Sequence, residues 1–316
     1  MTGYLIRRAL QAVFTVLLVT IAAFGLIHLV PGGEVHILLG KQANDPLALA
    51  ALNAELGLNR PIPVQYLSWL WGLLHGDFGF DYFQSQPVGT LLRAGIGVSG
   101  YIVLLATVFS VLIAVPLGVL QAIRRNSWID HTITTFSFIA YGIPIFFLGL
   151  VVQQIFQQDL SLIPTQIQLT SFTQAFTDPL GIVLPVFTLV ISGVAGYSRY
   201  MRSAMLDQIT QEYVRTAIAK GAHRRRVIYG HVLRNALIPM VTLIGFSLPA
   251  LAGGALIVEY VFNIDGIGLQ TIKAAFNSDY VFILGSTLIV AVLAVLGSLL
   301  ADISYAALDP RVRLDS

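Results

Sequence analysis

The residue types that could carry out chemistry are sparse in this chain of 316 residues. It has no cysteine, which excludes disulfides, thiol catalysis and cysteine-ligated metal sites. Its six histidines show neither the HxxxH nor the HExxH spacing of metal sites, and no GxSxG turn presents a serine nucleophile. The phosphate-binding loop GxxxxGKS or GxxxxGKT is absent as well. We therefore expect no catalytic residue, cofactor site or metal site, and a protein that is not an enzyme.

The most distinctive polar segment is Arg199–Arg234, which holds eight of the eighteen Lys and Arg residues. Within it, small and apolar residues follow the i, i+3, i+4, i+7, i+8 spacing of one helical face: Val214, Ala217, Ile218, Gly221 and Ala222. Gly221 predicts a break between two short helices, because glycine disfavours a helix interior. Such a segment either docks on a protein partner or lies on the lipid surface, and the pattern alone leaves both open.

Composition identifies the elements that surround this segment. Hydrophobic residues make up 56% of the chain and charged residues 11%, against about 25% charged residues in a soluble domain. Several apolar runs exceed the ~18 residues that indicate a membrane helix. The predicted fold is an all-α polytopic membrane protein.

Six transmembrane helices can be placed, the first of them retained rather than cleaved as a signal peptide. The predicted spans are Ala9–Val30, Tyr101–Ile123, Ile133–Ile155, Leu180–Ser198, Ala236–Val258 and Val281–Ala301. With both termini inside, fourteen of the eighteen Lys and Arg residues lie on the inner side. This bias predicts cytoplasmic N and C termini.

The spans divide the chain into three parts. Residues 1–30 form the tail and first span, residues 31–100 an outer helical segment, and residues 101–316 the core domain. The loop between spans four and five covers about residues 199–237. Ionisable groups near the spans, such as His28, Glu259 and Asp302, fall at span ends, where hydration keeps the free-energy cost of their charge low. A proton-coupled carrier is therefore disfavoured.

Several motifs occur together in one order along nearly the whole chain. They are Tyr4–Arg8, Leu29–Gly32, Glu55–Pro61, Gly76–Gly79, Pro116–Val119, Arg124–Asp130, Glu212–Ala217, Ala219–Gly221, Leu233–Pro239, Gly253–Ala255, Glu259, Phe262, Gly266, Gly268, Asp279–Tyr280 and Ala307–Arg311. With these motifs the chain resembles the membrane permease subunit of bacterial ATP-binding-cassette importers of the dipeptide, oligopeptide and nickel class. It departs from the general importer motif at Arg215–Ala217, where Glu-Ala-Ala is usual.

The resemblance implies a set of partners. A second homologous permease would complete the pathway, one or two ATP-binding subunits would bind ATP and Mg, and an extracytoplasmic substrate-binding protein would deliver the ligand. Membrane lipid surrounds the chain, which resides in the bacterial cytoplasmic (inner) membrane, and no nucleic acid is a partner.

The resemblance also implies site residues. ATPase coupling falls on Glu212, Tyr213, Thr216, Ala217, Lys220, Gly221 and Ala222. Pathway or gate candidates are Tyr141, Pro144, Pro249, Gly253, Gly254 and Glu259. The implied cargo is short peptides. The alternatives are nickel chelates or glutathione carried by the same type of permease, or a stand-alone carrier or channel.

Overall fold

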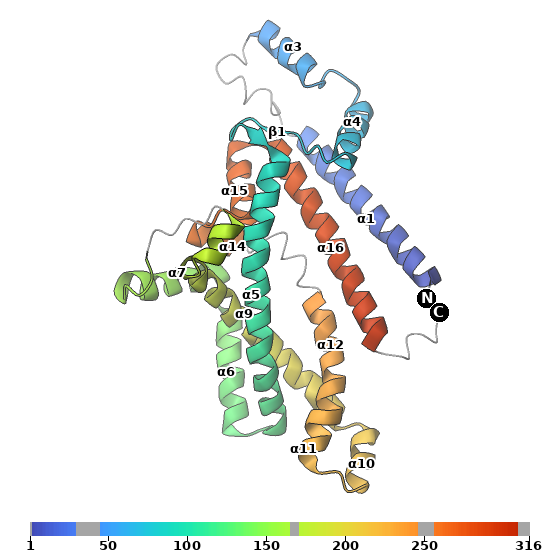
Figure 1. Ribbon diagram of the computed structural model, residues 1–316, viewed down its shortest axis with the longest axis vertical. Helices are drawn as coiled ribbons and strands as arrows, with labels where there is room; N and C mark the ends of the chain where they lie inside the picture. Colours follow the sequence, from blue (N-terminus) through green and yellow to red (C-terminus); the bar gives the residue numbers. More distant parts are fainter. Residues whose placement is uncertain (1, 30–44, 165–170, 246–255, 309–316) are drawn as a thin grey trace.

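The computed structural model describes residues 2–29, 45–164, 171–245 and 256–308, and these ranges are almost entirely helical (Figure 1). The all-α prediction is confirmed. Within the described residues the one sheet is an antiparallel pair that was not predicted, β1 Phe80–Asp81 with β2 Gln86–Pro87.

Four long continuous helices form the frame: α1 Thr2–His28, α5 Val88–Ile123, α9 Leu180–Ile209 and α16 Tyr280–Leu308. Together with the shorter stretch Arg224–Gly245, five described helical segments are long and apolar enough to cross a membrane, and one bent pair makes up to six. The polytopic prediction is confirmed. Helix α5 begins at Val88 instead of Tyr101, and α9 continues past Ser198 to Ile209. The apolar runs marked the lipid-crossing part of these helices, whereas the helices themselves extend into polar sequence.

The third span is not the continuous helix that was predicted for Ile133–Ile155. The chain forms α6 Trp128–Gly142, then α7 Ile145–Gln153 with a π-helical end, η2 Gln154–Asp159, and the two parts meet at 98°. Pro144 explains the break, because proline lacks an N–H and disfavours the helical conformation of the residue before it. Ile143 is accordingly extended, with φ −74° and ψ 126°.

The fifth predicted span, Ala236–Val258, is described only at its two ends. Short helices α10 Glu212–Ala219, α11 Arg224–Val227 and the π-helical η3 Ile228–Val232 lead into α12 Leu233–Gly245. The chain is described again in α14 Leu256–Phe262 and α15 Ile267–Asn277. Three gate candidates, Pro249, Gly253 and Gly254, lie outside the described residues.

The segment between the first two spans is helical, as predicted, and forms α3 Pro46–Glu55 and α4 Ile62–Leu74, while α8 Phe172–Thr177 lies between the third and fourth spans. Helix α4 packs on α1: the hydroxyls of Thr20 and Tyr66 lie 2.9 Å apart, and the Phe24 ring contacts those of Tyr66 and Trp69. Helices α3 and α4 lie at the end of the molecule opposite α10 and α11 (Figure 1).

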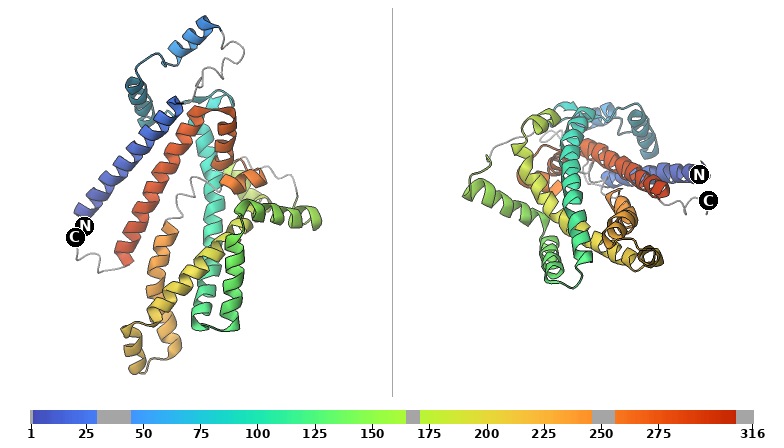
Figure 2. Two further views of the ribbon diagram at one scale, coloured as in Figure 1. Left: turned by 180° about the vertical axis from the view of Figure 1, so that it is seen from behind. Right: turned by 60° about the horizontal axis from the view of Figure 1, so that its bottom comes forward.

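The bundle is centred on the crossing of α5 and α9, which the views from behind and from below also show (Figure 2). Gly118 permits this close approach, since a Cβ there would lie 2.7 Å from the Ser198 carbonyl oxygen and 2.6 Å from Met201 Cβ. Around the crossing, buried residues of α5, α9, α10, α11, η3 and α12 form one apolar group, which we call the inner cluster: Val119, Ala122, Met201, Ala204, Met205, Val214, Val227, Ile228, Val232, Ala236 and Met240.

Candidate coupling surface and transport cavity

Helix α10 ends in a turn that only glycine fits without strain. The N–H of Gly221 donates to the Ile218 carbonyl (2.9 Å), and the N–H of Ala222 donates to the Ala217 carbonyl (3.1 Å). These two bonds form a Schellman motif, which satisfies carbonyls that a helix end leaves unpaired. Gly221 has φ +82°, a left-handed conformation that side chains with a Cβ disfavour. The predicted break at Gly221 is confirmed.

Three residues of the small apolar stripe, Val214, Ala217 and Ala222, face the protein's own interior, whereas Ile218 and Gly221 are exposed. Val214 is buried, and Tyr213, Ala217 and Ala222 are half-buried against the inner cluster. Val214 is therefore covered by the same chain, whereas the assignment of the half-buried Ala217 and Ala222 to a partner surface stays a prediction. A helix of eight residues is unstable alone and gains its stability from packing its apolar side, and the nearest apolar surface belongs to the same chain.

The opposite side of α10 is open. We call it the free face, and it consists of Glu212, Arg215, Thr216, Ile218, Ala219 and Lys220, all exposed. Ile218 is its apolar centre, with 55% of its surface exposed. Among the predicted coupling residues, Glu212, Thr216, Lys220 and the adjoining Gly221 are thus accessible. Arg215 and Ile218 complete the surface, and their i, i+3 spacing makes them neighbours on the helix.

A buried ion pair that the sequence reasoning missed joins α6 to α9. Arg202 donates from Nε and Nη2 to the two carboxylate oxygens of Asp130, both at 2.8 Å, and the backbone N–H of Asn126 donates to Oδ2 at 3.0 Å. Asp130 is 1% exposed. Bidentate pairs of this kind fix geometry as well as charge. The signal in the sequence was Ser127, which caps α6 three residues before Asp130.

A cavity of about 570 Å³ opens beside this ion pair, between α6, α9 and the end of α12. Eight of its twelve lining residues have polar side chains: Thr134, Tyr141, Ser192, Tyr197, Arg199, Tyr200, Arg202 and Ser203. The guanidinium of Arg199 lies over the rings of Phe138 and Tyr141, at 4.2 and 5.1 Å from their centroids. The gate candidate Tyr141 is therefore part of the cavity wall. Pro144 does not line it and instead begins α7.

Glu259 is not the hydrated span-end residue that the sequence suggested, because it is 0% exposed. Its carboxylate accepts from the N–H groups of Gly268 (2.8 Å) and Leu269 (3.2 Å) and from the hydroxyl of Ser99 (2.7 Å). The Ser99 oxygen in turn accepts from the Ile267 N–H at 2.9 Å. Glu259 thus fastens α14 to the N-terminus of α15 and to α5, a site that favours negative charge. A role in gating stays a prediction.

Two buried carboxyls meet near the start of α16, Asp81 in β1 and Asp279 just before α16. Burial, together with the neighbouring charge of Asp81, raises the pKa of Asp279 to about 6, although the Phe282 N–H bond to it acts in the opposite direction. The raised pKa of Asp279 reflects the free-energy cost of keeping two negative charges close together away from water.

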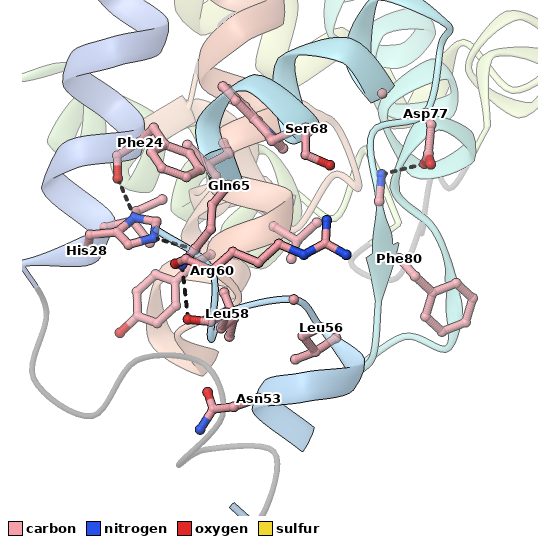
Figure 3. Close-up of a pocket in the computed structure, with 18 of the residues that line it drawn as sticks. Phe24, His28, Asn53, Leu56, Leu58, Arg60, Gln65, Ser68, Asp77 and Phe80 are labelled. Carbon is pink, nitrogen blue, oxygen red and sulfur yellow. Dashed lines mark hydrogen bonds between the residues drawn. The ribbon is translucent and has the colours of Figure 1, made fainter. Parts of the chain in front are cut away.

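An outer cavity of about 630 Å³ lies between α1, the α3–α4 segment, β1 and the start of α16 (Figure 3). The guanidinium of Arg60 extends between a wall formed by His28 and Gln65 and a wall formed by Asp77 and Phe80 (Figure 3). Gln65 holds the first wall, since it contacts His28 Nε2 at 3.1 Å and donates to the Arg60 carbonyl at 2.7 Å.

Comparison with known proteins matches nearly the whole chain. Residues 114–314 match the model of the binding-protein-dependent transport system inner membrane component family, and residues 1–89 match the model of its N-terminal region. The chain belongs to this family. It is similar to the oligopeptide transport system permease protein AppB of Bacillus subtilis (strain 168), with 38% identity over 99% of each chain. It is also similar to a putative peptide permease protein of Brucella suis biovar 1, with 35% identity over 99% of this chain and 100% of the relative. The dipeptide transport system permease protein DppB of Escherichia coli K12 is 32% identical over 99% of each chain.

The family assignment identifies the kind of assembly to which this chain belongs. The chain is a multi-pass membrane subunit of a binding-protein-dependent transport system, and such a system has further subunits. The N-terminal family region covers α1, the outer helices and the small sheet, whereas the core region covers the inner cluster, α10 and the cavity at Arg199.

Proposed function

We propose that this chain is half of the translocation pathway of an ATP-driven importer of short peptides. The observation that carries the proposal is the similarity, over 99% of the chain, to relatives that are named oligopeptide and dipeptide permeases. A second, homologous permease supplies the other half of the pathway. One or two ATP-binding subunits bind ATP and Mg and provide the energy, and this chain has no nucleotide site of its own.

The orientation follows from the distribution of charge. Fourteen of the eighteen Lys and Arg residues lie on the side of α10 and α11 when both termini are cytoplasmic, in the bacterial inner membrane. Helices α3 and α4 then lie outside, where an extracytoplasmic binding protein delivers the peptide.

Coupling in this proposal runs through the inner cluster. An ATP-binding subunit seats on the free face of α10, and its closure moves α10 as a unit. Val214 belongs to the inner cluster and Ala217 packs against it, and the same cluster includes Met205 of α9 and Met240 of α12, so a shift of α10 would be passed to those helices through the cluster. Closely packed interiors transmit displacement because they have few voids to absorb it. Both helices line the cavity at Arg199, and their movement would change its access.

Purification tests the assembly. The tagged chain, extracted from its own cells in mild detergent, should retain a second permease chain and an ATP-binding subunit. Proteoliposomes of that complex with its binding protein should take up radiolabelled Ala-Ala only when ATP is supplied on the ATPase side. Uptake by this chain alone would support a stand-alone carrier. Uptake of nickel chelates or glutathione in place of Ala-Ala would refute the peptide assignment.

A further inference from the structure

The cavity between α6, α9 and α12 contains one positive charge that the described part of the chain does not neutralise. Arg202 is paired with Asp130, whereas Arg199 pairs with no carboxylate among the described residues and is held by aromatic ring faces. Arg199 and Arg202 are three residues apart on α9 and therefore lie on the same side of the helix. The aromatic contacts orient the Arg199 guanidinium without using its hydrogen-bond donors in the way that a carboxylate would.

The cavity wall combines apolar surface with polar side chains. Eight of its twelve lining residues carry polar side chains, among them Tyr197, Tyr200 and Ser203 of α9, although most of the surface of the wall is apolar. Polar and charged side chains in membrane helices face the bundle interior or a water-filled cavity, where they mark substrate pathways. Tyr141 is 63% exposed in the isolated chain, so this wall is open toward space that the chain itself does not fill.

The position along α9 places this cavity in the inner half of the membrane. Helix α9 begins at Leu180 on the outer side, and Arg199 lies 19 residues later. That spacing corresponds to ~28 Å of helix, close to the ~30 Å thickness of the hydrocarbon core. A ligand that contacts Arg199 has therefore nearly completed its passage.

We propose that Arg199 is a binding residue for the carboxylate of the transported peptide on the release side of the pathway. This inference rests on the proposed function, because the carboxylate is that of the cargo. Arginine suits the task since its planar guanidinium binds a carboxylate through two parallel hydrogen bonds and stays charged at every physiological pH. The peptide C-terminus exchanges water for this guanidinium and the neighbouring hydroxyls, and it leaves when α9 and α12 move apart.

The test compares two probes in proteoliposomes of the complete complex: radiolabelled Ala-Ala and its C-terminal amide, each at a concentration that saturates the binding protein. Arg199→Gln should lower Ala-Ala uptake about tenfold, as expected for losing hydrogen bonds to a charged group, and should leave uptake of the amide unchanged. Arg199→Lys should give an intermediate value. Arg125→Gln, an exposed arginine of the inner loop, is the matched control and should transport both probes as the parent does.

A second readout covers the case in which the binding protein rejects the amide. Binding of Ala-Ala to the purified complex without its binding protein should weaken about tenfold in Arg199→Gln, while amide binding stays the same. Equal loss for peptide and amide would show a structural role and overturn the proposal. An effect that vanishes in pure phosphatidylcholine vesicles would assign Arg199 to an anionic headgroup, which also overturns it. If the parent complex takes up no Ala-Ala at all, both the peptide assignment and this inference fail, whereas normal Ala-Ala uptake by Arg199→Gln refutes the inference alone.

Discussion

Replacing Ile218 tests the assignment of the free face of α10 as the docking surface. Ile218 keeps 55% of its surface exposed on the structured loop. Burying a whole isoleucine side chain contributes about 1.5–3 kcal/mol, so covering the exposed half against an ATP-binding subunit contributes ~0.8–1.6 kcal/mol. Ile218→Ala should therefore weaken ATPase association about 4- to 14-fold at a tenfold change per 1.4 kcal/mol.

The assay is a titration of the purified permease pair with its ATP-binding subunit, followed by fluorescence anisotropy. Ile62→Ala is the matched control, since Ile62 is 54% exposed but lies on α4 at the opposite end of the molecule. The control should bind as the parent does. Equal binding by Ile218→Ala and the parent, or an equal loss in the Ile62 control, would refute the docking assignment.

Three further outcomes follow from the structure. Gly221→Ala forces a Cβ into a left-handed turn at a cost of roughly 1 kcal/mol. It should lower both the melting temperature and the uptake obtained per ATP hydrolysed, whereas the control Gly230→Ala in η3 should lower neither. Equal melting temperatures for the two variants would contradict the strained turn. Asp130→Asn breaks the bidentate pair with Arg202 and should lower the free energy of unfolding of the complex by about 1–3 kcal/mol. The control Asp207→Asn, at an exposed position, should have little effect. Similar free energies of unfolding for the two variants would show that the pair is not stabilising. The pKa of Asp279 is raised in the fold from 3.8 to about 6. The stability that protonation of Asp279 contributes should therefore be complete below pH ~4 and lost as the pH rises through 6. The melting temperature should fall over this pH range, and Asp279→Asn should remove this dependence.

The sequence predicted the architecture well because its strongest signals are physical requirements of the membrane. Long apolar runs correctly indicated the spans apart from the bend in the third, and clustered cations and Gly221 indicated the loop and the break between α10 and α11. Helix ends were less certain. Helix α9 continues through Arg199 and Arg202, which looked like loop residues because charge marks the end of an apolar run, although it does not end a helix.

The sequence pattern did not show which side chains contact one another. The stripe at Val214 and Ala217 has the spacing of a docking face, but spacing does not show whether the covering surface belongs to a partner or to the same chain. Glu259 followed an apolar run and was read as hydrated, while its true partners, Ser99 and the N-terminus of α15, come from other helices. The same holds for Asp130, whose arginine is 72 residues away.

Site-specific crosslinking tests the central claim most directly, namely that energy reaches this chain through the free face of α10. The chain has no cysteine, so single cysteines can be introduced without background. Ile218→Cys and Ile62→Cys are each labelled with a benzophenone maleimide on the purified chain, which is then assembled with its partners and irradiated, and the crosslinked chains are identified by mass spectrometry. The account predicts a crosslink from position 218 to the ATP-binding subunit and none from position 62. A 218 label that reaches only lipid or this chain would contradict it.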